Sequence, residues 1–303
     1  MNIERIKLYL NRPEYIFRPN QIYHRIFDKE LNLGTSHKHV VLPWGLQIKI
    51  PTSNTDVVGK AISAYGVYDL SLTEIIWRLV GIGETAVDIG ANIGYVTSIM
   101  AKRVGASGQV WCFEPNPEVY SELSVNVNSW KHDLGWNNIH TEEIALSDKS
   151  GSGILNITPN RGESFIDNGD TEKDDFSCGR YNVRLERLEN FFEKQRDIGL
   201  LKIDVEGHEF QVLQGAGELI SRCCIRNIIF EEHHRYPSPV TQFLEENGYT
   251  IFRIWKGFWK PILLSPTDNL LHPWEPPNYL ATHDHQRVQM LLKDWGWQSL
   301  RGK

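Results

Sequence analysis

The chain has 303 residues, of which 41% are hydrophobic and 23% are charged, so it can form one large α/β domain with additions or two modest domains. The formal net charge is -6 and the pI is near 6.0, so the chain has no general attraction for nucleic acid or an anionic membrane. We therefore expect neither as a partner.

The N-terminal segment carries a charge every few residues and contains no apolar run of the roughly 18 residues that a membrane span needs. We find no signal-peptide pattern in it and expect a cytoplasmic protein. The four cysteines have neither metal-type spacing nor the density of a disulfide scaffold, which favours reduced thiols. Residues 1–66 are predicted to form an N-terminal extension, with a strand pair, VVLP and LQIKI, around Pro43-Trp44-Gly45.

Between residues 70 and 256, strand-like apolar runs alternate with segments of helical periodicity. The runs are TAVDIG, QVWCFE, LLKIDV and RNIIFEE. This alternation indicates a parallel sheet with helices on both faces. Residues 158–182 are polar and poor in aliphatic side chains, so we expect a loop there. A last helical pattern spans residues 284–300.

The stretch AVDIGANIGYVTSIM, residues 86–100, joins the first of these strands to a helix. Asp88 lies at the carboxyl end of the strand, and Gly90 and Gly94 permit a tight turn and a close approach of backbone to a ligand. The free N–H groups of the helix start favour a polar or anionic ligand. Asn92 and Tyr95 occupy the second and third glycine positions of the dinucleotide fingerprint G-x-G-x-x-G, so NAD is disfavoured.

The next strand ends in CFEPNP, where Glu114 follows Asp88 by 26 residues. A carboxylate at this strand end can accept hydrogen bonds from both hydroxyls of a ribose. An acid, a glycine turn and a second acid in this order resemble the class I S-adenosylmethionine-dependent methyltransferases. The sequence therefore predicts a sulfonium nucleoside as the ligand.

The run KIDVEGHE, together with VDIGANIGY, EPNP, ALSDKSG and FEEHH, resembles the FkbM family of methyltransferases over roughly residues 66–282. The resemblance implies an α/β, Rossmann-like class I domain over residues 67–282, with a C-terminal helical tail over 283–303. The domain is expected to have a doubly wound, mostly parallel seven-stranded sheet whose last strand is antiparallel, with YTIFRIW pairing with PNYLATH. The implied S-adenosylmethionine-binding residues are Asp88, Gly90, Asn92, Gly94, Glu114, Asn116 and Ala145, where Ala145 marks the end of the third strand. Glu189 and His208 are assigned no role.

Two further strand ends supply candidates for catalysis. Asp204 and Glu206 follow the fourth strand, and Glu231 and His233 follow the fifth, so they are expected at the same rim of the sheet. His233 is suited to take a proton from an alcohol, with Glu231 or Glu206 orienting it, and Asp204 is an alternative partner for the acceptor hydroxyl. A divalent cation on the three acids is a further alternative, but no metal ligand is predicted. Glu209 is expected to cap the helix that follows.

The resemblance implies methyl transfer, but it leaves the acceptor open. Our first choice is O-methylation of a hydroxyl of a sugar or another natural product. The alternative is N-methylation of an asparagine side-chain amide in a peptide or protein, and a third reading is a binding module that keeps the cofactor without catalysis. The sequence does not indicate the oligomeric state.

Overall fold

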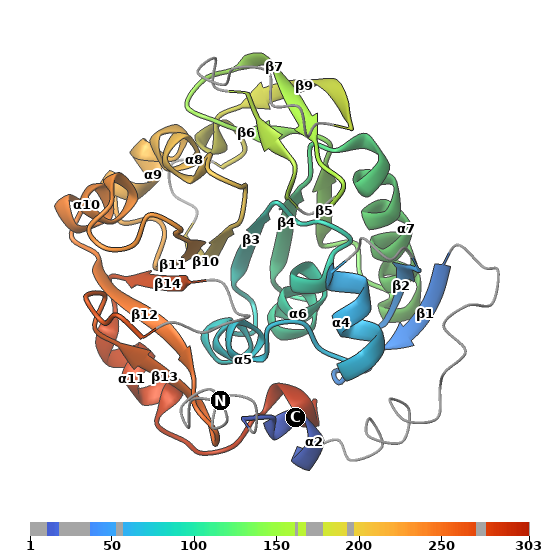
Figure 1. Cartoon of the computed structure of the whole chain (residues 1–303), viewed down its shortest axis with the longest axis vertical. Helices are drawn as coiled ribbons and strands as arrows, with labels where there is room; N and C mark the ends of the chain where they lie inside the picture. Colours follow the sequence, from blue (N-terminus) through green and yellow to red (C-terminus); the bar gives the residue numbers. More distant parts are fainter. Residues whose placement is uncertain are drawn as a thin grey trace, which may run out of the picture.

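Eight strands form the central sheet in the order β13-β12-β14-β11-β10-β3-β4-β5 (Figure 1). Five of them run parallel: β3 (Thr85–Ile89), β4 (Gln109–Phe113), β5 (Ile139–Glu142), β10 (Ile198–Ile203) and β11 (Asn227–Glu231). β14 (Asn278–Thr282) lies antiparallel between β11 and β12 (Thr250–Lys256), which confirms the predicted pairing of YTIFRIW with PNYLATH. The prediction of seven strands is one too few, because β13 (Pro261–Leu264) folds back on β12 as an extra edge strand.

The computed structural model describes residues 11–17, 37–52, 57–160, 163–167, 178–192, 197–270 and 277–302. Half of the predicted N-terminal extension, about half of the predicted loop over 158–182 and part of the return before β14 lie outside these residues. Within the described part of the chain, no helix is both long enough and apolar enough to cross a membrane.

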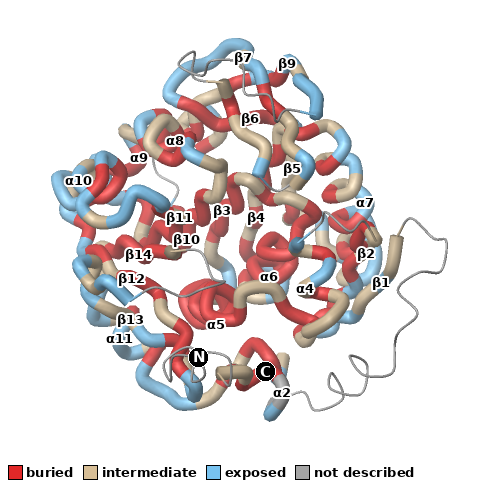
Figure 2. Tube along the Cα trace, in the orientation of Figure 1, coloured by how far each residue is buried: buried red, intermediate tan, exposed pale blue. Residues whose placement is uncertain are grey.

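The sheet is buried on both faces by helices. Its parallel strands send alternate side chains to opposite faces, so that Ala86 belongs to one core and Val87 to the other. On the first face lie α5 (Leu70–Leu79), α6 (Tyr95–Val104) and α7 (Pro117–Leu134). On the second face lie α8 (Glu209–Gly215), α9 (Gly217–Ser221) and α10 (Pro239–Glu246). Figure 2 shows the resulting buried centre of the molecule.

The predicted N-terminal strand pair is confirmed. β1 (His37–Val41) pairs antiparallel with β2 (Gln47–Pro51), and β2 packs against α7. Trp130 of α7 donates its indole N–H to the carbonyl of Gln47 at 2.6 Å. Two further helices belong to this region, α2 (Pro13–Phe17) and α4 (Val57–Tyr65).

A second, smaller sheet was not predicted. It has the order β6-β9-β7-β8 and consists of β6 (Ala145–Leu146), β7 (Gly151–Ile157), β8 (Phe165–Ile166) and β9 (Gly179–Glu186). The third strand of the central sheet ends at Glu142, so the prediction that it ends near Ala145 is wrong, and β8 and the start of β9 fall within the predicted loop. These strands were missed because each one is short or mostly polar on one side. Their apolar residues form a core only when they pair across the sheet.

The C-terminal segment is bound to α5. The predicted helix over residues 284–300 is two pieces, α11 (His285–Leu292) and the 3₁₀ turn η3 (Ser299–Arg301), separated by Gly296 with φ +99°. A buried ion pair on α5, Arg78 with Glu74, bonds to backbone groups on this segment. Because α5 is buried along its whole length, the C-terminal segment completes its burial rather than forming a separate unit.

Candidate functional site

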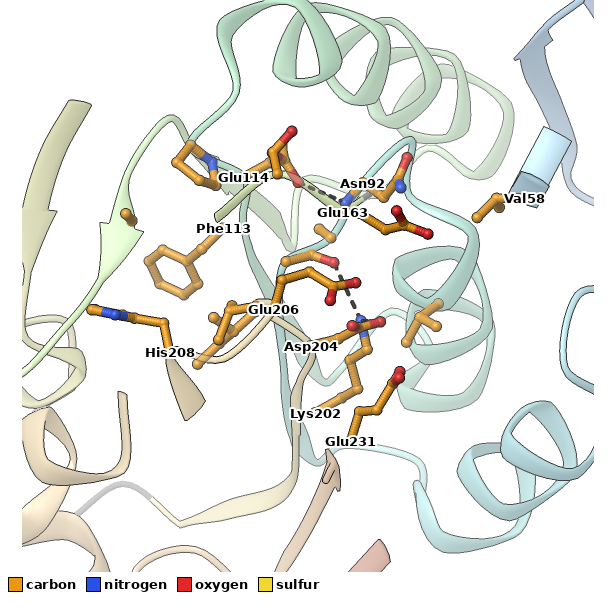
Figure 3. Close-up of a pocket in the computed structure, with 18 of the residues that line it drawn as sticks. Val58, Asn92, Phe113, Glu114, Glu163, Lys202, Asp204, Glu206, His208 and Glu231 are labelled. Carbon is orange, nitrogen blue, oxygen red and sulfur yellow. Dashed lines mark hydrogen bonds and ion pairs between the residues drawn. The ribbon is translucent and has the colours of Figure 1, made fainter. Parts of the chain in front are cut away.

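A cavity of about 590 Å³ lies at the carboxyl ends of the parallel strands (Figure 3). Eight of the eleven residues predicted from the sequence line it: Gly90, Asn92, Glu114, Ala145, Asp204, Glu206, Glu231 and His233. The other three, Asp88, Gly94 and Asn116, are buried or packed behind its wall. The cavity therefore lies at the strand ends, as the sequence predicted, but three of the predicted residues do not line it.

The turn after β3 packs directly on the backbone that follows β10. Gly90 has φ +72°, and a Cβ there would lie 1.9 Å from the carbonyl oxygen of Asp204, so no larger residue fits without a shift of the backbone. Asn92 also has a positive φ, 51°, and its Oδ1 accepts the N–H of Ile93 at 2.7 Å. This turn leaves backbone exposed to the cavity at close range, as a bound ligand requires.

Glu114 is fixed at the end of β4 by two backbone groups. Its Oε2 accepts the N–H of Asn92 at 2.9 Å, and its Oε1 accepts the N–H of Asn116 at 3.0 Å. Burial raises the pKa of Glu114 to about 7, although both N–H groups act to lower it. The carboxylate is thus held in one orientation against the glycine turn, where it can accept two hydroxyl groups of a ligand.

Gly94 and Asn116 support the site from outside the cavity. Gly94 is the N-cap of α6, and a Cβ there would lie 2.8 Å from Leu123 and 2.9 Å from Trp130 of α7. The side chain of Asn116 caps α7 by accepting the N–H of Glu118 at 3.1 Å. The side-chain oxygen of Asn116, predicted to belong to the cofactor site, is thus used in the cap, and Asn116 is not among the residues that line the cavity.

A buried lysine that the sequence analysis did not single out lies beneath the glycine turn. Lys202 of β10 is opposite Asp88 of β3, and its Nζ lies 3.5 Å from Oδ1 of Asp88 and 3.2 Å from Oδ2 of Asp204. It also donates to the carbonyl of Gly90 at 3.2 Å (Figure 3). Burial lowers the pKa of Lys202, but the two carboxylates outweigh it and hold the pKa above its usual value. The signal was a charged residue inside the apolar run LLKIDV.

Asp88 itself is fully buried, and its Oδ2 accepts the hydroxyl of Thr97 at 2.6 Å. Burial raises its pKa, while Lys202 and Thr97 oppose the rise. Asp88 therefore acts on the cavity through Lys202 rather than by facing it.

The four predicted catalytic residues lie together at the rim. Nε2 of His233 is 2.8 Å from Oε1 of Glu231, and the imidazole is half exposed. Burial and then the negative charges of Asp204 and Glu206 raise the pKa of Glu231 to about 9. Burial and Asp204 likewise raise the pKa of Glu206 to about 7. These carboxyl groups hold protons near neutral pH because several acids share a partly buried space with one lysine.

Two side chains from distant parts of the chain complete the cavity, and the sequence analysis did not predict either. Glu163 comes from the connection between β7 and β8, and its charge contributes to the raised pKa of Glu206. Tyr68 precedes α5, and its ring packs edge-on against Tyr95 with centroids 6.2 Å apart. Burial, followed by Asp204 and other acids, raises the pKa of Tyr68, so its phenol remains protonated. No local pattern marked either residue.

The turn between β10 and α8 contains two residues that the sequence analysis treated separately. Glu209, expected to cap α8, accepts the N–H of Gly207 at 3.2 Å in the first turn of the helix. His208, which was assigned no role, is buried and lines the cavity. Its Nε2 lies 3.0 Å from the hydroxyl oxygen of Ser147.

Among the described residues, no group of three or more His, Cys, Asp or Glu side chains is arranged to hold a metal ion. Asp204, Glu206 and Glu231 line one cavity, where Asp204 pairs with Lys202 and Glu231 with His233.

The doubly wound sheet with an antiparallel strand inserted beside β11, the glycine turn after β3 and the fixed acid after β4 define a class I methyltransferase fold. The profile of the FkbM methyltransferase domain matches residues 88–251, more than half of the chain. The chain belongs to the FkbM methyltransferase family and is an S-adenosylmethionine-dependent methyltransferase.

The methyltransferase sdnD of Sordaria araneosa is 28% identical over 204 residues, which are 58% of this chain and 76% of that protein. Two solved structures are similar to this chain at lower identity. A methyltransferase FkbM from Methylobacillus flagellatus is 16% identical, with a TM-score of 0.42 over 65% of this chain and 43% of that one. A SAM-dependent O-methyltransferase from Thermotoga maritima is 16% identical, with a TM-score of 0.40 over 71% of this chain and 65% of that one. The match thus spans less than two thirds of each solved chain.

Proposed function

We propose that this enzyme transfers a methyl group to a hydroxyl of a sugar or another natural-product acceptor. The observation that carries the proposal is the pair formed by His233 and Glu231, 2.8 Å apart at the rim that also holds Asp204. An alcohol must lose its proton as it is methylated, and a base placed within hydrogen-bond reach typically accelerates such a step by roughly 10² to 10⁴-fold.

The cavity fits S-adenosylmethionine. Gly90 lets the turn pack closely on the backbone at Asp204 beside the cavity, and Glu114 presents a carboxylate fixed by two backbone N–H groups, which suits two ribose hydroxyls. Ala145 lies farther along the wall, where it would border the adenine. When bound, S-adenosylmethionine supplies a methyl group activated by the sulfonium.

The protein's own contribution is to place the acceptor and to move one proton. The reacting hydroxyl donates its hydrogen bond to His233, which takes the proton as the new O–C bond forms and the methyl–sulfur bond breaks. Asp204 accepts a hydrogen bond from a second polar group of the acceptor and so orients it. Glu231 holds the imidazole in place through Nε2. Positioning of the two reactants is the larger contribution, on the order of 7 to 11 kcal/mol for well-oriented groups.

The shape and lining of the cavity support a small acceptor over a peptide. A peptide whose asparagine amide is methylated would need an extended open groove, whereas part of this cavity is lined by Asn160, Glu163 and Ser164, which lie between β7 and β8. Tyr68 and Tyr95 add aromatic surface to the lining, which suits a sugar ring. The four convergent titratable groups also favour an active enzyme over a module that only binds the cofactor.

The test is the variant Asp204→Asn, compared with Asp133→Asn on the surface of α7 as a matched control. Each protein is incubated with methyl-labelled S-adenosylmethionine and small-molecule pools from the native host, and the label is located by mass spectrometry. We expect an O-methyl product, a rate at least about 100-fold lower for Asp204→Asn, and unchanged affinity for S-adenosylhomocysteine by calorimetry. Undiminished turnover by Asp204→Asn would remove Asp204 from the mechanism, and label on nitrogen would select the alternative reaction.

A further inference from the structure

The first turn of α4 brings two valines to the cavity. Val57 and Val58 both line it, and Val57 is 53% exposed although its side chain is apolar. Val58 is half-buried and packs against the core on the first face of the sheet. Both valines precede residues 88–251, which match the profile of the FkbM methyltransferase domain, so membership of the family assigns them no role.

Side chains from α5 and α6 add to this apolar lining. Leu72 of α5 and Val96 of α6 line the cavity, as does Tyr68 just before α5. Leu72 and Val96 belong to the core against which Val58 and Tyr68 pack. Contact between apolar side chains and water is unfavourable, so this part of the cavity favours a hydrocarbon group over water.

The two valines lie away from the part of the cavity that suits the nucleoside. Figure 3 shows Phe113 and Glu114 on the opposite side of the cavity from Val58, and Asp204 lies between them. A cofactor whose ribose is held by Glu114 carries an ammonium and a carboxylate at its amino-acid end, and these charged groups need polar partners. The side chains of Val57 and Val58 offer none. They are therefore suited to the second reactant rather than to the cofactor.

We propose that Val57 and Val58 bind a hydrocarbon portion of the acceptor, beyond the hydroxyl that is methylated. This inference rests on the proposed function and narrows its substrate class. The acceptor is then an alcohol with an apolar skeleton, or a sugar linked to one, and not a free sugar. Because the hydrocarbon portion does not react, its contacts are the same before and during methyl transfer, so they lower KM and leave kcat unchanged.

The experiment begins with small molecules of the native host, partitioned between water and ethyl acetate. Each pool is incubated with the full chain and methyl-labelled S-adenosylmethionine, and the labelled products are identified by mass spectrometry. We expect the O-methyl product from the ethyl acetate pool. The acceptor isolated from that pool then serves as the substrate for measuring KM and kcat.

Val57→Asp places a charge against the hydrocarbon portion and should raise KM for this acceptor at least about tenfold, with kcat and the affinity for S-adenosylhomocysteine unchanged. An exposed aspartate is tolerated in the first turn of a helix, so the variant should fold. Val57→Leu remains apolar and should keep a low KM. The matched control is Val125→Asp on α7, where the valine is 47% exposed and outside the cavity lining, and its KM should be that of the unmodified protein.

An O-methyl product from the water pool alone would overturn the inference and leave the proposed function intact. Equal KM values for Val57→Asp and Val125→Asp would also overturn it, as would a loss of affinity for S-adenosylhomocysteine in Val57→Asp, because Val57 would then contact the cofactor. Label on nitrogen, or no labelled product from either pool, would refute the proposed function and this inference with it.

Discussion

Lys202→Met tests whether the buried lysine is required to keep Asp88 ionised. Asp88 is fully buried, and its Oδ1 lies 3.5 Å from Nζ of Lys202. Without the lysine, burial will force Asp88 to keep its proton in the folded protein. Taking up that proton against an ordinary pKa of 3.8 costs about 4 kcal/mol at pH 7 and less than half of that at pH 5, and these are upper limits for the effect of the substitution because the pKa of Asp88 is already raised in the unmodified protein. The first value agrees with the roughly 3–5 kcal/mol lost when one partner of a buried pair is removed.

The direction of the pH dependence of this stability loss follows from proton binding. In the variant the folded state holds a proton on Asp88 that the unfolded chain has lost, so the added instability should grow with pH, by at most about 1.4 kcal/mol per pH unit, once pH exceeds the raised pKa that Asp88 has in the unmodified protein. Urea unfolding followed by tryptophan fluorescence at pH 5 and pH 7 measures it. The double variant Lys202→Met with Asp88→Asn has no carboxyl group to protonate and should recover most of the stability at pH 7.

Two results would refute this reasoning. One is a loss of less than about 1 kcal/mol at pH 7, which would mean that Lys202 does not hold a buried charge. The other is a double variant whose change in unfolding free energy equals the sum of the changes in the two single variants. Residues that share an ion pair should instead show a coupling free energy of roughly 0.5–3 kcal/mol.

Two further predictions concern the turn and the rim. Gly90→Ala should weaken binding of S-adenosylhomocysteine at least about tenfold in calorimetry, because its Cβ would lie 1.9 Å from the Asp204 carbonyl oxygen. The control Gly135→Ala has a similar φ of +67° but open space around the new Cβ, and it should bind normally. An equal loss of affinity in both variants would show that backbone strain, and not the contact with Asp204, weakens binding. Glu231→Gln should stabilise the unliganded protein by about 2 kcal/mol at pH 8 and much less at pH 5. The pKa of Glu231, raised to about 9, makes its contribution to stability fall as pH rises from about 4.5 to about 9; parallel thermal unfolding curves for the two proteins across this range would contradict it.

The residues at the strand ends could be predicted because the regularity that positions them is local. A parallel sheet brings the carboxyl ends of its strands to one edge, so the acids that follow β3, β4, β10 and β11 converge whatever the loops do. Glu114, Asp204 and Glu231 were therefore found without coordinates. Lys202 was missed although its sequence signal was present, because a lysine in an apolar strand looks like an exception until its two carboxylate partners are known.

The roles of individual predicted residues depended on side-chain geometry. Asn116 and Gly94 belong to the same motif as Glu114, yet one caps α7 and the other allows α6 to pack on it. Both are close to the cavity in the chain but outside it in space. Spacing along a motif places a residue within a few ångströms of a ligand, and the choice between contact and support depends on which way its side chain points.

By itself, the sequence determined the alternation of strands and helices, the glycine turn and the acids that follow the strands, because hydrophobic periodicity and turn chemistry act over a few residues. Only the tertiary structure decided the second sheet and the eighth strand. It also decided the placement of Glu163, Tyr68 and His208 around one cavity. These features come from contacts between segments far apart in the chain. Such contacts form because the whole fold buries them together, and no local pattern records which distant segments will meet.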